Sequence, residues 1–166
     1  MQNVVSMVHV LAAILLLGPV TVAISMFPKL ALAARGGEAG TVGAARTMHA
    51  ISRTYGMWSL LVPLLGFGVM FTNLSTYMKS GEMHAAILLA IIAWALLFFL
   101  IIPRQRLMMA GLGIADEDED VDDPEFIERR KKADELDWDK QKGQLAMFSG
   151  IFSLLWVVAG ILMFFI

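Results

Sequence analysis

The sequence alternates long uncharged, apolar runs with shorter charged segments. Four runs contain no Asp, Glu, Lys or Arg, namely residues 2–27, 54–78, 84–103 and 144–166. At a helical rise of about 1.5 Å per residue, each run is long enough to cross about 30 Å of hydrocarbon. Lipid offers no partner to backbone N–H and C=O groups, so runs of this length are expected to be helices. The pattern predicts an all-α membrane protein in which four transmembrane helices form a single domain over residues 1–166.

Composition supports this fold class and narrows the possible chemistry. Hydrophobic residues make up 58% of the chain, charged residues 17%, and the mean hydropathy is +0.69, which is too apolar for a soluble domain. The absence of cysteine excludes a disulfide framework, an iron–sulfur cluster and thiol catalysis. No phosphate-binding loop, serine elbow or suitable carboxylate pair is present, so we predict no catalytic residue, no enzyme activity and no nucleic-acid partner.

Basic residues indicate the orientation of the helices. The first and third connections carry most of them, whereas the opposite side carries only Lys79. The positive-inside rule therefore places both long loops in the cytoplasm and both termini outside, in the multi-pass topology of a bacterial cytoplasmic membrane protein. The basic residues of the two loops are Lys29, Arg35, Arg46, Arg53, Arg104, Arg106, Arg129, Arg130, Lys131, Lys132, Lys140 and Lys142.

The first connection is predicted to begin where Pro28 stops the first helix. Its Ala/Arg-rich part, residues 41–53, is expected to form a short helix on the membrane surface with its arginines among anionic lipid headgroups. The alternative is an ordinary polar connection whose arginines anchor helix ends.

The third connection, residues 104–143, is the largest polar segment. Asp123 followed by Pro124 is typical of a helix N-cap and first turn, which predicts a cytoplasmic amphipathic helix over about residues 124–142. Acidic and basic side chains at i,i+4 spacing support that helix.

An acidic stretch precedes this helix. Asp116, Asp118 and Asp120 have the alternation of an EF-hand loop, but Val121 and Ile127 stand where that loop needs glycine and glutamate, so no metal site is predicted. Loose binding of divalent ions is the alternative to a solvated or partner-binding segment. The expected partner-binding carboxylates are Asp116, Glu117, Asp118, Glu119, Asp120, Asp122 and Asp123.

Histidine is the one candidate cofactor ligand at membrane depth. His9 lies in the first run and His84 begins the third, so both are expected toward the outer leaflet. A pair of imidazoles on neighbouring helices can ligate haem b. We expect the alternative to ligation, in which no cofactor is bound, His9 forms a hydrogen bond between helices and His84 lies among the headgroups.

Small residues at four-residue spacing predict faces where helices approach closely, and such pairs are Ala86 with Ala90, Ala146 with Gly150, and Ser149 with Ser153. Ala86, Ala90, Gly150 and Ser153 are the positions expected to pack against partner subunits.

The first run, Val8-His9-Val10-Leu11-Ala12-Ala13-Ile14-Leu15-Leu16-Leu17-Gly18-Pro19, resembles the start of small bacterial integral membrane proteins of uncharacterised function. In size, topology and charged cytoplasmic loop, the chain also looks like the accessory subunits of the actinobacterial cytochrome bc–cytochrome oxidase supercomplex. This resemblance implies a non-catalytic accessory or assembly subunit of a respiratory membrane complex. The alternatives are a small haem- or metal-binding redox protein that uses His9, and a homo-oligomeric channel or transporter.

Overall fold

The computed structural model describes residues 2–165, and no strand is found in this part of the chain. The helices are α1 (Gln2–Arg35), α2 (Thr41–Trp58), α3 (Leu61–Thr72), α4 (Leu74–Tyr77), α5 (Gly81–Leu96), the π-helix η1 (Leu97–Ile101), α6 (Ile102–Gly111), α7 (Pro124–Asp134) and α8 (Trp138–Met163).

Four helical segments are long and apolar enough to cross a membrane, which confirms the number of spans expected from the sequence. They are Val4–Arg35, Thr41–Thr72, Gly81–Gly111 and Trp138–Met163. Large apolar side chains such as Leu15, Leu64, Leu88 and Leu154 point outward and are 66%, 62%, 58% and 62% exposed. Such a surface suits lipid and not water.

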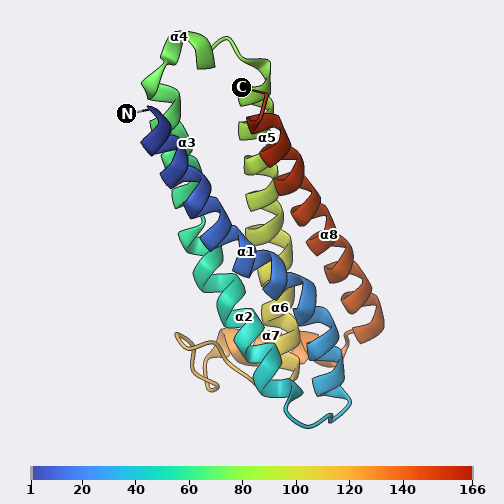
Figure 1. Cartoon of the computed structure of the whole chain (residues 1–166). Helices are drawn as coiled ribbons and strands as arrows, with labels where there is room; N and C mark the ends of the chain where they lie inside the picture. Colours follow the sequence, from blue (N-terminus) through green and yellow to red (C-terminus); the bar gives the residue numbers. More distant parts are fainter. Residues whose placement is uncertain (1, 166) are drawn as a thin grey trace.

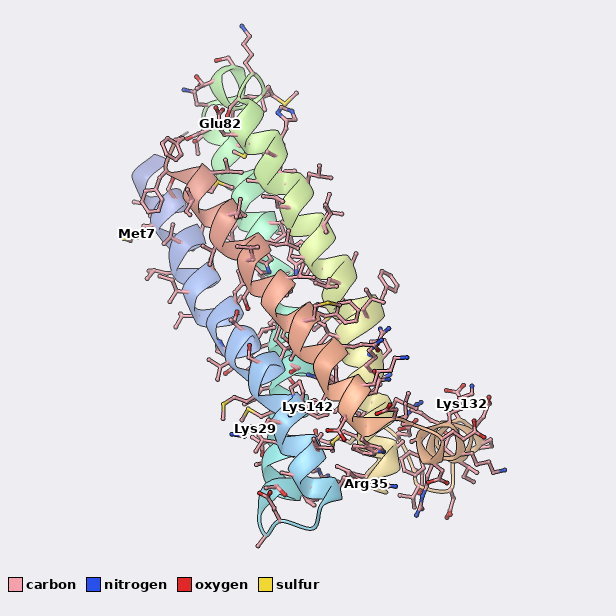
Figure 2. The ribbon with its side chains drawn as sticks, turned by 90° about the vertical axis from the view of Figure 1, so that its right-hand side faces the viewer. Met7, Lys29, Arg35, Glu82, Lys132 and Lys142 are labelled. Atoms are coloured by element: carbon pink, nitrogen blue, oxygen red, sulfur yellow. The ribbon has the colours of Figure 1, made fainter. Side chains whose placement is uncertain are left out.

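The segments form an antiparallel bundle with two different ends (Figure 1). The two termini and α4 lie at one end, which we call the terminal end. The turn 36–40, the loop 112–123 and α7 lie at the other, the charged end, and there α7 crosses the bundle. Lys29, Arg35, Lys132 and Lys142 gather at the charged end, whereas Glu82 lies at the terminal end (Figure 2).

Pro28 does not stop the first helix, so this prediction was wrong. Pro28 is fully buried inside α1, which continues to Arg35. A proline removes the hydrogen bond to the carbonyl four residues before it, here that of Ile24. The hydroxyl of Ser149 on α8 donates to this carbonyl at 2.8 Å, and the Ser149 side chain is buried. A neighbouring helix therefore satisfies the group that the proline leaves free, and the helix can continue.

Residues 41–53 do not form a separate surface helix. They are the first part of α2, which packs along α1 and, after a turn at Ser59 and Leu60, leads into α3. Ala45 is completely buried in this packing. The turn precedes Pro63, which cannot donate to the carbonyl of Ser59, and the amide of Val62 donates to that carbonyl instead at 3.0 Å.

The third span contains a local irregularity before Pro103. The π-helix η1 lies between α5 and α6, and the amide of Ile102 donates to the carbonyl of Leu97, one residue farther back than in an α-helix. The side chain of Arg104 donates to the carbonyl of Leu100 at 3.2 Å. The wider turn thus lies just before Pro103, where a proline interrupts the regular hydrogen bonding of the helix.

The helix predicted over residues 124–142 is divided in two. The start is as expected, because Asp123 accepts from the amide of Glu125 at 2.8 Å and Pro124 opens α7. α7 ends at Asp134, however, and Asp137 caps a new helix by accepting from the amide of Lys140 at 3.0 Å. Residues 138–142 therefore belong to α8, and the fourth span begins earlier than its apolar run.

Candidate functional site

A buried group of charged side chains joins α2, α6 and loop 112–123 at the charged end. His49 and Arg53 lie one turn apart on α2 and so face the same side, Arg106 comes from α6, and Asp116 comes from the loop. Oδ1 of Asp116 lies 2.9 Å from Nε2 of His49, and Oδ2 lies 2.9 Å from Nη1 of Arg53 and 2.8 Å from Nε of Arg106. We call these four residues the Asp116 cluster.

Further polar side chains support the histidine of this cluster. Nδ1 of His49 donates to Oε1 of Gln105 at 3.0 Å, and Nε2 of Gln105 donates to Oγ of Ser52 at 3.3 Å. Gln105 and Ser52 are completely buried. Nε2 of His49 faces Oδ1 of Asp116, so the ring has an oxygen partner at both nitrogens. His49, Gln105 and Ser52 are thus linked by hydrogen bonds, whereas Nε of Arg106 and Oδ2 of Asp116 meet as an ion pair at 2.8 Å without a hydrogen bond.

The environment of Asp116 lowers the pKa of its carboxyl group. Burial alone disfavours the charged form and raises the pKa, since only 7% of the side chain is exposed. The hydrogen bond and charge of His49, together with the charges of Arg53 and Arg106, outweigh burial and hold the pKa below its ordinary value. Asp116 therefore acts as the common anion for Arg53 and Arg106 and as a hydrogen-bond partner of His49.

Other carboxylates of the acidic stretch also have partners within the chain. Arg53 binds Asp118 at 2.9 Å, and Arg129 of α7 binds Glu119 at 2.8 Å. Together with Asp116 and the helix cap Asp123, these interactions use four of the seven carboxylates that the sequence assigned to partner binding. The remaining ones, Glu117, Asp120 and Asp122, are exposed.

His9 lies beside an apolar cavity among α1, α3, α5 and α8. Its Nδ1 donates to the carbonyl of Val62 at 2.9 Å, which is the hydrogen bond between helices that the sequence offered as the alternative to ligation. The cavity has a volume of about 280 Å³. It is lined by His9, Ala13, Leu17, Pro63, Gly66, Phe67, Met70, Met83, Ala86, Ile87, Ala90, Ile91, Trp94, Trp156, Ala159, Gly160 and Met163.

His84 is not brought to His9. It begins the third span at the terminal end, where Nδ1 donates to the carbonyl of Ser80 at 2.7 Å and the side chain is exposed. It does not line the cavity, so the pair of imidazoles expected for haem is not assembled. Among residues 2–165, no group of three or more His, Asp or Glu side chains is placed to hold a metal ion.

The small residues that were expected to pack against partner subunits lie on different faces in the structure. Ala86 is buried and, with Ala90, lines the cavity, so these alanines face the interior of the bundle and are not available to an outside helix. Gly150 is exposed on α8, and Ser153 beside it is half-buried. Of these four residues, Gly150 is therefore the one that is fully accessible on the outside of the bundle.

The sequence did not lead us to predict the Asp116 cluster as a unit. The available signal was the i,i+4 spacing of His49 and Arg53, together with Gln105 and Arg106 directly after an apolar run. Each of these features is also typical of a solvated helix end. Only the contact between Asp116 and α2 distinguishes a buried cluster from such a helix end.

No model of a known protein family, no curated protein and no solved structure matches this chain.

Proposed function

We propose that this chain is a non-catalytic accessory or assembly subunit of a larger complex in the bacterial cytoplasmic membrane. The observation that carries this proposal is the outer face of α8. This helix packs against α1 and α5 on one side and leaves its other side open.

The open side of α8 carries small residues at a spacing of three and four positions. We call this set the small-residue stripe, and it consists of Gly143, Ala146, Gly150 and Ser153. The two glycines are exposed, and a Cβ atom added to either of them would meet no atom within 4 Å. The helix backbone is therefore accessible along the stripe.

Such a stripe is suited to close contact with another helix in lipid. Lipid tails are as apolar as leucine, so helices associate in membranes mainly through tight packing, to which small residues give access. Glycines on a lipid-facing surface make few van der Waals contacts of their own, and a partner helix laid on the stripe supplies them. This argument favours a subunit interface over a lone bundle.

The resemblance of the sequence supports a respiratory assembly, the cytochrome bc–oxidase supercomplex, as the partner. The exposed carboxylates Glu117, Asp120 and Asp122 lie on a loop that is fastened to the bundle by the Asp116 cluster. A loop held in this way loses little conformational entropy on binding. Its exposed carboxylates suit docking on a basic surface of a partner.

Replacement of Gly150 by leucine tests the proposal. The new side chain would cover the middle of the stripe, so we expect Gly150→Leu to run as the free 18.2 kDa chain on a native gel of gently extracted membranes. The unaltered protein is expected to run in a much larger, haem-absorbing band. Gly18→Leu is the matched control, because Gly18 is also an exposed helical glycine with nothing within 4 Å of an added Cβ. If the unaltered protein, Gly150→Leu and Gly18→Leu all run as the free chain, the proposal is contradicted.

We further propose that the charged end lies in the cytoplasm. Single cysteines are informative because the chain has none of its own. Lys79 and Glu117 are exposed at opposite ends of the bundle. In intact cells, an impermeant maleimide is expected to label Lys79→Cys and to leave Glu117→Cys unlabelled until the membrane is opened. The reverse pattern would overturn this orientation.

A further inference from the structure

The cavity beside His9 has an unusual lining. Six of its lining residues are alanine or glycine, namely Ala13, Gly66, Ala86, Ala90, Ala159 and Gly160. Small residues inside a membrane bundle normally bring two helices into contact. Here they border an open space, while α1 and α3 diverge from α5 and α8 toward the terminal end (Figure 1). The small side chains thus make room instead of closing the bundle.

The hydrogen bond of His9 fixes which ring nitrogen is free. The carbonyl of Val62 can only accept, so Nδ1 must carry the proton of the neutral ring, and Nε2 keeps a lone pair. Gly66 positions the ring, because a Cβ at this site would lie 3.1 Å from Cε1 of His9. The imidazole therefore rests against α3 and offers the cavity a hydrogen-bond acceptor.

Trp156 forms part of the wall of the cavity. Its ring is fixed by edge-to-face contacts with Trp94 at 5.7 Å and Phe152 at 6.2 Å between centroids. The Nε1 atom of Trp94 donates to Oγ of Ser59 at 3.0 Å, and the Nε1 atom of Trp156 is buried and does not open into the cavity. The two indoles therefore present apolar ring surface, and the acceptor of His9 is the polar group that the lining offers a ligand.

From these features we propose that the cavity binds a membrane-dissolved ligand with a hydroxyl-bearing aromatic ring, of the phenol or quinol class. The hydroxyl group donates to Nε2 of His9, and the ring packs against the indole of Trp156. The apolar lining holds the ring, and any hydrocarbon tail leaves between the diverging helix pairs into the lipid.

The size of the cavity agrees with a single substituted ring. Apolar cavities of roughly 150 Å³ bind benzene, and sites for drug-sized ligands begin at about 300 Å³. The volume of about 280 Å³ lies between these values. Met70, Met83 and Met163 are flexible side chains in the lining, and they can adapt to ring substituents.

The test uses the full chain in phosphatidylcholine nanodiscs and equilibrium dialysis with 2,3,5-trimethylphenol. We expect saturable binding of one molecule per chain, above the partition into empty nanodiscs. The methyl ether, 2,3,5-trimethylanisole, has the same ring but no donor for His9. Its affinity should be lower than that of the phenol by a factor of up to about ten. His9→Leu should weaken binding of the phenol by a similar factor.

Two substitutions on α5 separate the cavity from the outer surface. Ala90→Phe places a ring in the cavity and should abolish binding, whereas Leu88→Phe changes a side chain that is 58% exposed on the outside and should leave binding unchanged. Circular dichroism confirms that each variant is folded. Absence of saturable binding, or equal affinity for the phenol and its ether in the unaltered protein, would overturn the proposal and leave acyl chains as the occupant.

Discussion

Replacement of Asp116 by asparagine is expected to lower the free energy of unfolding by about 3 kcal/mol at neutral pH. The substitution removes the one carboxylate that His49, Arg53 and Arg106 share. Arg53 keeps its ion pair with Asp118, whereas the partly buried guanidinium of Arg106 loses its paired carboxylate. The lower end of the range for buried ion pairs applies, because the two arginine side chains are 26% and 36% exposed. Thermal unfolding in mild detergent measures the loss, and hydrogen exchange should show faster exchange of the amides in loop 112–123.

Asp118→Asn is the matched control for this prediction. Asp118 lies two positions away and binds the same Arg53, but its side chain is 67% exposed. Exposed pairs contribute about 0–1 kcal/mol, so this variant should remain close to the unaltered protein. Equal losses for the two variants would show that burial of Asp116 has no energetic importance.

The pH dependence of the free energy of unfolding shows whether the charge of Asp116 causes the loss of stability in Asp116→Asn. Because the folded state lowers the pKa of Asp116, its contribution is fully present above the ordinary aspartate value of about 4 and is lost as the pH falls through the lowered value. The difference between the unaltered protein and Asp116→Asn should therefore be constant between pH 7 and pH 5 and shrink below about pH 4. A difference that persists unchanged at lower pH would point to packing and not to charge.

Replacement of Gly111 by valine is expected to cost about 1–3 kcal/mol, because it overfills the junction of α6, α7 and α8. A Cβ at position 111 would lie 2.8 Å from Cζ2 of Trp138 and 3.0 Å from Cβ of Ala133. Trp138 cannot move freely, since it is 8% exposed and the guanidinium of Arg35 lies 5.1 Å from its ring centroid. Thermal unfolding followed by tryptophan fluorescence measures the change.

Gly43→Val provides the control for the crowded site. Gly43 is an exposed helical glycine of α2, and an added Cβ would meet nothing within 4 Å, so the change in stability should stay within about 0.5 kcal/mol. If both glycine variants unfold at the same temperature, the close packing of Gly111 against Trp138 is not a source of stability.

The sequence was sufficient for features that depend on local pattern. Long runs without charge predicted the four spans, and Asp123 with Pro124 predicted the start of α7. Both follow from neighbouring residues alone, since lipid requires internal backbone hydrogen bonding and an N-cap satisfies the amides of the next turn.

The features that the sequence could not predict depend on residues far apart in the chain. Pro28 stays inside α1 because Ser149 donates to the carbonyl of Ile24, from which it is separated by 125 positions. The acidic loop is fastened to the bundle because Asp116 pairs with His49, 67 positions earlier. Periodicity gives no information about such partners. The same limit explains Ala86, because its spacing shows a face of small side chains but not whether that face borders a cavity or a partner.

Cross-linking from Gly150 tests the central claim, membership of a larger membrane assembly, most directly. A cysteine at this position would carry a benzophenone maleimide at the middle of the exposed small-residue stripe, and Gly18→Cys would carry the same reagent on the outer face of α1. After irradiation of native membranes, we expect Gly150→Cys to give one discrete adduct with another integral membrane subunit and Gly18→Cys to give lipid adducts. Lipid adducts from both positions would contradict the proposal that α8 packs against a partner.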